Sequence, residues 1–158
     1  MRKLIKEDEI RLDPNESPGY LVRNTNIALG KALRRRLSEY GMTLGQYYFM
    51  RALWIEEGLN QRELSRRVGT TEPTTASALR LLEKKGLIRR IRNRQDRRTI
   101  NIFSTPKARN LKNDLSRMAN NINEIATKGL SIQDIQDIKR LMTEMKANLD
   151  GDENTSPT

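Results

Sequence analysis

Apolar residues recur at helical spacing through the first third of the chain. Between residues 20 and 40 they form two neighbouring stripes: Leu21, Ala28 and Ala32, and Leu29, Leu33 and Leu37. Together the stripes make a wide apolar face, which predicts a helix that ends at Gly41. Thr43 and Gln46 have the spacing of a capping box, so a second helix is predicted from Thr43 to Gly58.

The next segment has the pattern of a helix-turn-helix. Asn60 is a capping residue with a glutamate three positions later, and the helix that it opens is predicted to end at Val68–Gly69. A tight turn leads to Glu72–Pro73, where proline suits the first turn of a further helix, 71–85, that stops at Gly86. Two short helices joined by a turn that contains glycine predict a helix-turn-helix.

A basic hairpin is predicted directly afterwards. Residues 87–92 and 98–103 read as strands around the tip 93–97, and Ile100 and Ile102 alternate with polar neighbours in the second strand. A hairpin that follows a helix-turn-helix makes a winged helix. The predicted fold class is therefore mainly α, with a small β-hairpin wing and a helical dimerisation region.

Two further helices are predicted after Pro106. In the first, apolar residues are spaced four, three, four and three apart until Gly129: Leu111, Leu115, Met118, Ile122 and Ile125. Ser131 and Asp134 open the second, whose apolar positions are Ile135, Ile138, Met142, Met145 and Leu149. Because only 35% of the residues are hydrophobic, we expect these faces to pack against each other, against the helix 20–40 and against a second subunit in a homodimer; packing within one chain alone is the alternative.

These elements predict four regions along the chain. Residues 1–18 are expected to form an N-terminal arm, and residues 150–158 a disordered tail. The dimerisation region is expected to combine 19–42 with 106–149. The winged helix-turn-helix occupies 43–105.

Charge is concentrated between Arg80 and Arg98. This stretch holds nine lysines and arginines against Glu83 and Asp96, in a chain of formal net charge +10. Clustered cations on one side of a packed element suit a nucleic-acid backbone; a basic hairpin that is merely solvated is the alternative. We expect no contact with membranes, because no apolar run approaches the roughly 18 residues of a spanning helix. The expected location is the cytoplasm, with the nucleoid.

The chain has no cysteine and no histidine. Thiol chemistry is thereby excluded, and the commonest general base and metal ligand is missing. Two acidic pairs remain, Glu56 with Glu57 and Asp134 with Asp137, and no phosphate-binding glycine loop accompanies them. We therefore expect no enzyme, no cofactor and no metal site.

An ordered set of motifs resembles the MarR family of dimeric winged-helix transcriptional regulators. The matching segments are 44–47 (Leu-Gly-Gln-Tyr), 64–68 (Leu-Ser-Arg-Arg-Val), 82–88 (Leu-Glu-Lys-Lys-Gly-Leu-Ile), 96–98 (Asp-Arg-Arg) and 104–106 (Ser-Thr-Pro). The resemblance extends from about residue 19 to 149. It implies a triangular homodimer that binds double-stranded DNA at a palindromic operator, usually as a repressor. Two-fold symmetry then implies half-sites about 10 base pairs apart.

The helix 71–85 is the predicted recognition helix. The second helix of a helix-turn-helix presents its N-terminal residues to base edges in the major groove. We expect Thr74, Thr75 and Ser77 in that role, with Arg80 as an additional contact. The alternative is that the hydroxyl groups only cap and solvate the start of the helix.

The resemblance assigns the insertion of an arginine into the minor groove to Arg98. Narrow A·T-rich minor grooves attract arginine through their negative potential. Arg94 and Arg97 are expected to contact phosphates. Asp96 would repel a phosphate, so we interpret it as a clamp that holds an arginine in shape; an exposed ion pair that orders only the tip is the alternative.

Members of the family often bind small phenolic or anionic effectors between the second helix, the first helix and the winged lobe. The resemblance therefore suggests Tyr47, Tyr48 and Arg51 as lining residues, with Arg23 as a partner for an anion. Packing in the core is the alternative for the aromatic residues. Sensing of peroxide through a thiol is excluded because cysteine is absent.

The sequence thus predicts a DNA-binding transcriptional regulator that is released from its operator by a small aromatic or anionic effector. The alternative is a winged-helix scaffold that binds protein or RNA and has no operator.

Overall fold

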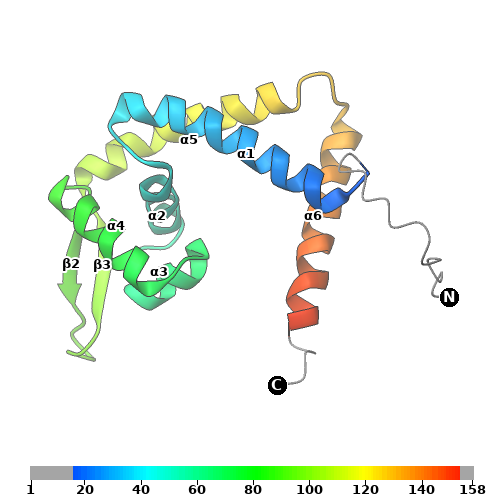
Figure 1. The fold of residues 1–158 in the computed structure, drawn as a ribbon. Coiled ribbons are helices and arrows are strands. Elements are labelled where there is room, and N and C mark those ends of the chain that lie inside the picture. The colour runs from blue at the N-terminus through cyan, green and yellow to red at the C-terminus, as the bar shows by residue number, and fades with distance from the viewer. Residues whose placement is uncertain (1–15, 154–158) are drawn as a thin grey trace. The chain divides into compact units, whose positions relative to one another are not determined.

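The computed structural model describes residues 16–153, and most of the predicted arm and the end of the predicted tail lie outside this range (Figure 1). The elements follow in the order α1 (Pro18–Leu37), the 3₁₀ helix η2 (Ser38–Tyr40), α2 (Leu44–Ile55), β1 (Leu59–Asn60), α3 (Gln61–Val68), α4 (Glu72–Lys84), β2 (Ile88–Arg92), β3 (Ile100–Ser104), α5 (Pro106–Ala126) and α6 (Ile132–Glu153). The predicted fold class is confirmed. The chain forms two compact units that divide between Ile122 and Asn123.

The ends of the helices follow local hydrogen bonds that the sequence predicts. Thr43 and Gln46 form a reciprocal capping box at the start of α2, and Asn60 and Glu63 form another at the start of α3. Such boxes satisfy two of the backbone N–H groups that a helix start leaves without partners. The prediction of a disordered tail from residue 150 is wrong for 150–153, because α6 continues to Glu153.

The wing belongs to a three-stranded antiparallel sheet in the order β1-β3-β2. In the register, Leu59 and Arg90 both lie opposite Ile102, on either side of the central strand. The sequence pattern missed β1, since two residues are too short to alternate. Ile102 is 1% exposed, whereas Ile100 is 42% exposed. Burial on this face therefore ends before Ile100, which lies further toward the tip.

Gly58 allows the sheet to join α2. Its φ of +81° belongs to the left-handed region, and a Cβ atom there would lie 3.2 Å from the ring of Phe103. Only glycine combines this backbone conformation with so close an approach. The Gly58 N–H donates to the carbonyl of Ile102 at 2.9 Å and extends the pairing of β1 with β3.

One apolar core fills the first unit. Its fully buried side chains come from α1, α2, α3, α4, β3 and α5: Leu37, Phe49, Met50, Leu53, Leu64, Leu79, Leu82, Ile102 and Leu115. Met118 and Ile122 of α5 join the same cluster. The apolar seam of α5 therefore packs within the chain as far as Ile122.

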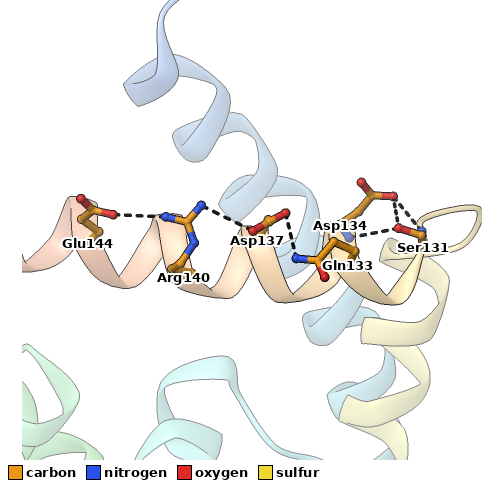
Figure 2. Close-up of polar contacts among 6 residues, drawn as sticks. All are labelled: Ser131, Gln133, Asp134, Asp137, Arg140 and Glu144. Atoms are coloured by element: carbon orange, nitrogen blue, oxygen red, sulfur yellow. Dashed lines mark hydrogen bonds and ion pairs between the residues drawn. The ribbon is translucent and has the colours of Figure 1, made fainter.

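The second unit is dominated by α6, which has two unlike faces. Ser131 caps the helix by reciprocal hydrogen bonds with Asp134 (Figure 2). Along the polar face, Gln133, Asp137, Arg140 and Glu144 interact in succession (Figure 2). The opposite face carries apolar side chains that are exposed in this chain: Ile138, Leu141, Met142 and Leu149. Such a face is unstable in water without a covering partner.

Candidate nucleic-acid interface

The start of α4 uses its threonines to cap the helix. The Thr71 hydroxyl accepts from the backbone N–H of Thr74, and the hydroxyls of the two residues lie 2.9 Å apart. Thr75 is completely buried, and its hydroxyl donates to the Thr71 carbonyl at 2.9 Å. The expectation that Thr75 contacts bases is therefore wrong: the hydroxyl completes the first turn of the helix and cannot reach a ligand.

Ser77 and Arg80 lie on the exposed side of the same helix. Within residues 16–153 neither side chain makes a hydrogen bond or ion pair, so both are available to a ligand. Thr74 is also exposed, but its hydroxyl already has Thr71 as a partner. The exposed surface of α4 therefore presents one free hydroxyl and one free guanidinium about a turn apart.

The wing tip is ordered by side chains that bind its own backbone. The side-chain amide oxygen of Asn93 (Oδ1) accepts from the backbone N–H groups of Gln95 and Asp96, at 2.8 and 3.1 Å. The Asp96 carboxylate accepts from the Arg98 N–H at 3.0 Å and from the Thr99 hydroxyl at 2.7 Å. Short polar side chains that bind nearby backbone groups in this way fix tight turns.

Asp96 binds the backbone of an arginine and not its side chain. No guanidinium lies within ion-pair distance of its carboxylate in the described part of the chain, so the alternative of an exposed ion pair does not apply there. The carboxylate holds Arg98 in place through the backbone N–H of that residue. The Thr99 hydroxyl, followed by the Arg98 N–H, lowers the pKa of Asp96 below its ordinary value, because both bonds favour the charged form.

Both acidic residues between Arg80 and Arg98, Glu83 and Asp96, therefore have partners within the chain. Glu83 forms an ion pair with Arg90, with the nitrogen and oxygen 3.1 Å apart. Arg89 lies over the ring of Phe103, 5.9 Å from its centroid. Along the described chain no ion pair involves the arginines of the tip, which are all exposed: Arg94, Arg97 and Arg98. These three cations remain available to an external anion.

A hollow of about 360 Å³ lies between the wing and the starts of α3 and α4. Arg98 lines it, together with Arg62, Glu72 and Arg90. Arg62 and the nearby Arg66 belong to the first helix of the helix-turn-helix, and the sequence reasoning missed both. In this motif the first helix crosses the nucleic-acid backbone, so the arginines of α3 were a usable signal.

The predicted effector residues are only partly brought together. Tyr48 and Arg51 line an open hollow of about 320 Å³ with four residues that were not predicted: Ala52, Ile55, Arg67 and Val68. Tyr47 is 2% exposed and packs in the core, where burial raises the pKa of its phenol. Arg23 is exposed on α1 and does not line this hollow. The grouping of all four residues in one pocket is therefore wrong.

The two acidic pairs, Glu56 with Glu57 and Asp134 with Asp137, have structural partners. Glu56 pairs with Arg67, and the Glu57 carboxylate accepts from both the backbone N–H and the hydroxyl of Ser104. Asp134 caps α6. Among the residues that the structure describes, no helix has the length and apolar character needed to span a bilayer.

Known proteins share this arrangement. The chain is 36% identical over 114 residues to the HTH-type transcriptional regulator TtmR of Methylorubrum extorquens, which covers 70% of this chain but only 58% of TtmR. It is 31% identical over 105 residues to SarZ of Staphylococcus haemolyticus, also an HTH-type transcriptional regulator, covering 66% of this chain and 71% of SarZ.

Solved structures share the fold of this chain. A MarR transcriptional regulator from Methanosarcina mazei Go1 superposes with a TM-score of 0.77 at 27% identity, covering 82% of this chain and 94% of the other. The model of the MarR family matches residues 42–100, from the start of α2 into the wing. The chain therefore belongs to the MarR family of winged-helix transcriptional regulators, which are not enzymes.

Proposed function

We propose that this protein is a homodimeric repressor that binds a palindromic DNA operator and is released by a small effector. The observation that carries the proposal is the wing: its backbone is held by Asn93 and Asp96, while its three tip arginines have no ion-pair partner in the described chain. A rigid support with free cations at its end suits the anionic surface of a duplex.

Each predicted contact then has a place on the duplex. Ser77 and Arg80 of α4 contact base edges and the adjacent backbone in the major groove, with Thr74 at the start of the helix. Arg98 enters the minor groove, and Arg94 and Arg97 contact phosphates. Arg62 of α3 adds a further phosphate contact. The interface is therefore wider than the hairpin alone.

A second copy of the chain accounts for the uncovered apolar surfaces. On α6 the uncovered side chains include Ile132, which is 78% exposed, and on α1 they include Leu21 and Ile27. Burying such side chains removes apolar area from water and drives association. A two-fold dimer repeats the α4 helix about 10 base pairs along the duplex, which requires a palindromic operator.

The hollow beside Tyr48 is the proposed effector site. Arg51 supplies positive charge, whereas Arg67 already pairs with Glu56; Tyr48 and Ile55 supply apolar surface, so the site suits an aromatic anion. A ligand that binds better when the two lobes are at the wrong spacing shifts the population away from the DNA-binding form. The protein is then released from the operator, because the effector has a higher affinity for the form that does not bind DNA than for the form that does.

Salt dependence tests the proposal. Binding through about six phosphates predicts a slope near −5 for log K against log salt concentration on duplex DNA. The titration uses the full chain on genomic fragments that it enriches from a random pool, with heparin and double-stranded RNA as competitors. A slope near zero, or equal affinity for all polyanions, contradicts the proposal and favours a scaffold that binds protein or RNA.

A further inference from the structure

Lys85 connects the recognition helix to a distant turn of the chain. It is the residue that follows α4, and it is only partly exposed. Its ammonium group donates to the carbonyl of Gly41 at 2.5 Å and to the side-chain oxygen of Gln46 at 2.8 Å. The two acceptors lie 44 and 39 residues away along the sequence. The lysine therefore makes a tertiary connection and not a local cap.

Both acceptors belong to the junction between α1 and α2. Gly41 follows η2, where the carbonyl groups at the end of a helical segment carry partial negative charge. Gln46 is 3% exposed, and the same oxygen also accepts from the Thr43 N–H at 3.2 Å. Because Gln46 already serves in the capping box of α2, its oxygen is fixed in position before Lys85 reaches it.

The end of α4 is also held from α5. Lys107 in the first turn of α5 donates to the Lys85 carbonyl at 2.9 Å, and the Thr105 hydroxyl donates to the Gly86 carbonyl at 2.7 Å. Lys85 thus accepts a hydrogen bond from α5 at its backbone carbonyl and donates two hydrogen bonds to the α1–α2 junction through its ammonium group. In the parts of the chain that the structure describes, no carboxylate forms an ion pair with Lys85.

We propose that Lys85 is a positioning residue that sets the orientation of the recognition helix relative to the α1–α2 junction and to α5. This inference rests on the proposed function, in which a dimer presents two α4 helices to one operator. If the orientation is held at Lys85, the distance between those helices is held too. Lys85 then determines how strictly the protein selects the spacing between half-sites, although it touches no DNA.

The chemistry of lysine suits this task. An ammonium group has three N–H donors on a compact centre, so it can bond to two oxygens that approach from different directions. A methionine has a stem of similar length and no donor. Lys85→Met therefore removes the two bonds with little change in the volume that the side chain fills. Lys84, the preceding residue, is exposed and makes no hydrogen bond or ion pair in the described chain, so Lys84→Met is a matched control for the loss of one positive charge.

The experiment measures affinity for three duplexes made from the enriched operator: the native one, and versions with two base pairs inserted or deleted between half-sites. Wild type and Lys84→Met are expected to prefer the native spacing to the same degree. In Lys85→Met the preference for native over altered spacing is expected to fall about fivefold, the scale of a typical coupling between sites. Non-specific affinity should fall no more in Lys85→Met than in Lys84→Met, because the Lys85 ammonium is bonded within the protein and neutralises no phosphate.

Hydrogen exchange of the free protein gives a reading that does not depend on DNA. Exchange in residues 41–46 and at the end of α4 should increase in Lys85→Met and not in Lys84→Met. If Lys85→Met does not fold, Lys85→Gln, which is shorter and neutral, takes its place in both measurements. A wild type that binds no duplex overturns the proposed function. If the wild type prefers the native half-site spacing and the Lys85 variant shows the same preference, the role of Lys85 is overturned and the proposed function is not.

Discussion

The recognition helix and the wing treat their polar side chains in opposite ways. At the start of α4 the hydroxyls of Thr71 and Thr75 bond within the helix, whereas the Ser77 hydroxyl and the Arg80 guanidinium further along it have no partner in the described chain. At the wing tip the short side chains Asn93 and Asp96 are used on the backbone, while every arginine projects without an internal partner in the described chain. The helix therefore presents few unpaired polar side chains on a regular backbone. The wing presents several unpaired arginines on an irregular backbone, which its own short side chains have to stabilise.

The difference follows from the length of the side chains. Threonine, asparagine and aspartate carry their polar atoms close to the backbone, where unpaired N–H and C=O groups are within reach. The arginine guanidinium lies at the end of a long chain and has only donors, so it needs an acceptor from elsewhere. A short polar side chain near a turn or helix cap is therefore expected to bind the nearby backbone before it binds a ligand, whatever its position in a motif.

The largest effect is expected from Arg98→Ala. Loss of the arginine that enters the minor groove should weaken operator binding roughly 10- to 100-fold, or about 1–3 kcal/mol, with the dimer intact. Fluorescence anisotropy with the enriched operator measures the affinity. Arg97→Ala is the control, because loss of a phosphate contact weakens all sequences equally and lowers the salt slope by about one. Unchanged affinity in Arg98→Ala removes the assignment to the minor groove.

Asp96→Ala should weaken operator binding about tenfold, although it removes a negative charge that would repel DNA. The reason is that Arg98 then has to be ordered on binding, at an entropic cost. Gln95→Ala, in an exposed neighbour at the same tip, is the control and should bind as the wild type does. Stronger binding by Asp96→Ala would mean that its charge matters more than its hydrogen bonds.

The pH dependence of the tip follows from the same carboxylate. The pKa of Asp96 is lowered in the folded protein, so its stabilising effect is complete above the unfolded value of about 3.9 and is lost as pH falls through the folded pKa. The NMR amide signals of Arg98 and Thr99 should therefore be constant from pH 8 to 5 and shift only in stronger acid. In Asp96→Asn this transition should be absent.

Ser77→Ala tests the free hydroxyl of the helix. It should change the preferred base at one position of each half-site a few-fold, consistent with roughly 1 kcal/mol for one hydrogen bond, and leave the salt slope unchanged. Selection from a randomised operator library measures the preference. An identical set of selected sequences would place Ser77 outside the base contacts.

Thr75→Val should have the smallest effect on DNA. The valine fills the same buried space, and the Thr71 carbonyl still accepts from the backbone N–H of residue 75. The stability of the protein should change by no more than about 1 kcal/mol in thermal unfolding, and affinity for the operator should be unchanged. A changed base preference would show that Thr75 leaves the core on binding, and would restore the original expectation.

Much of the fold was predictable because its signals are local. Helix starts at Thr43, Asn60 and Thr71 follow from side chains that bond three residues along, and such pairs are visible in any sequence. The wing also follows, from alternation and turn residues. The two-residue strand β1 does not, because it exists only through pairing with residues of β3 that are 41 and 43 positions away.

The candidate site was predicted less completely than the fold. Arg94, Arg97 and Arg98 are exposed as expected, since guanidinium groups are rarely buried without a partner. Thr75 lies on the predicted helix, but its hydroxyl bonds within the helix and not to a base. Asp96 lies in the predicted wing, where its carboxylate binds the Arg98 backbone and the Thr99 hydroxyl. Sequence spacing predicts the helix or turn on which a residue lies. It does not predict whether the side chain points to solvent, to the core or to the nearby backbone.

The sequence by itself determined the order of the elements, the helix caps, the basic wing and the family, because each depends on residues that are close together in the chain. The tertiary structure alone decided that α5 is closed within the chain as far as Ile122, that Tyr47 belongs to the core, and that Lys85 reaches Gly41 and Gln46. These contacts join segments dozens of residues apart. Their existence depends on the packing of the whole unit, which no local pattern records.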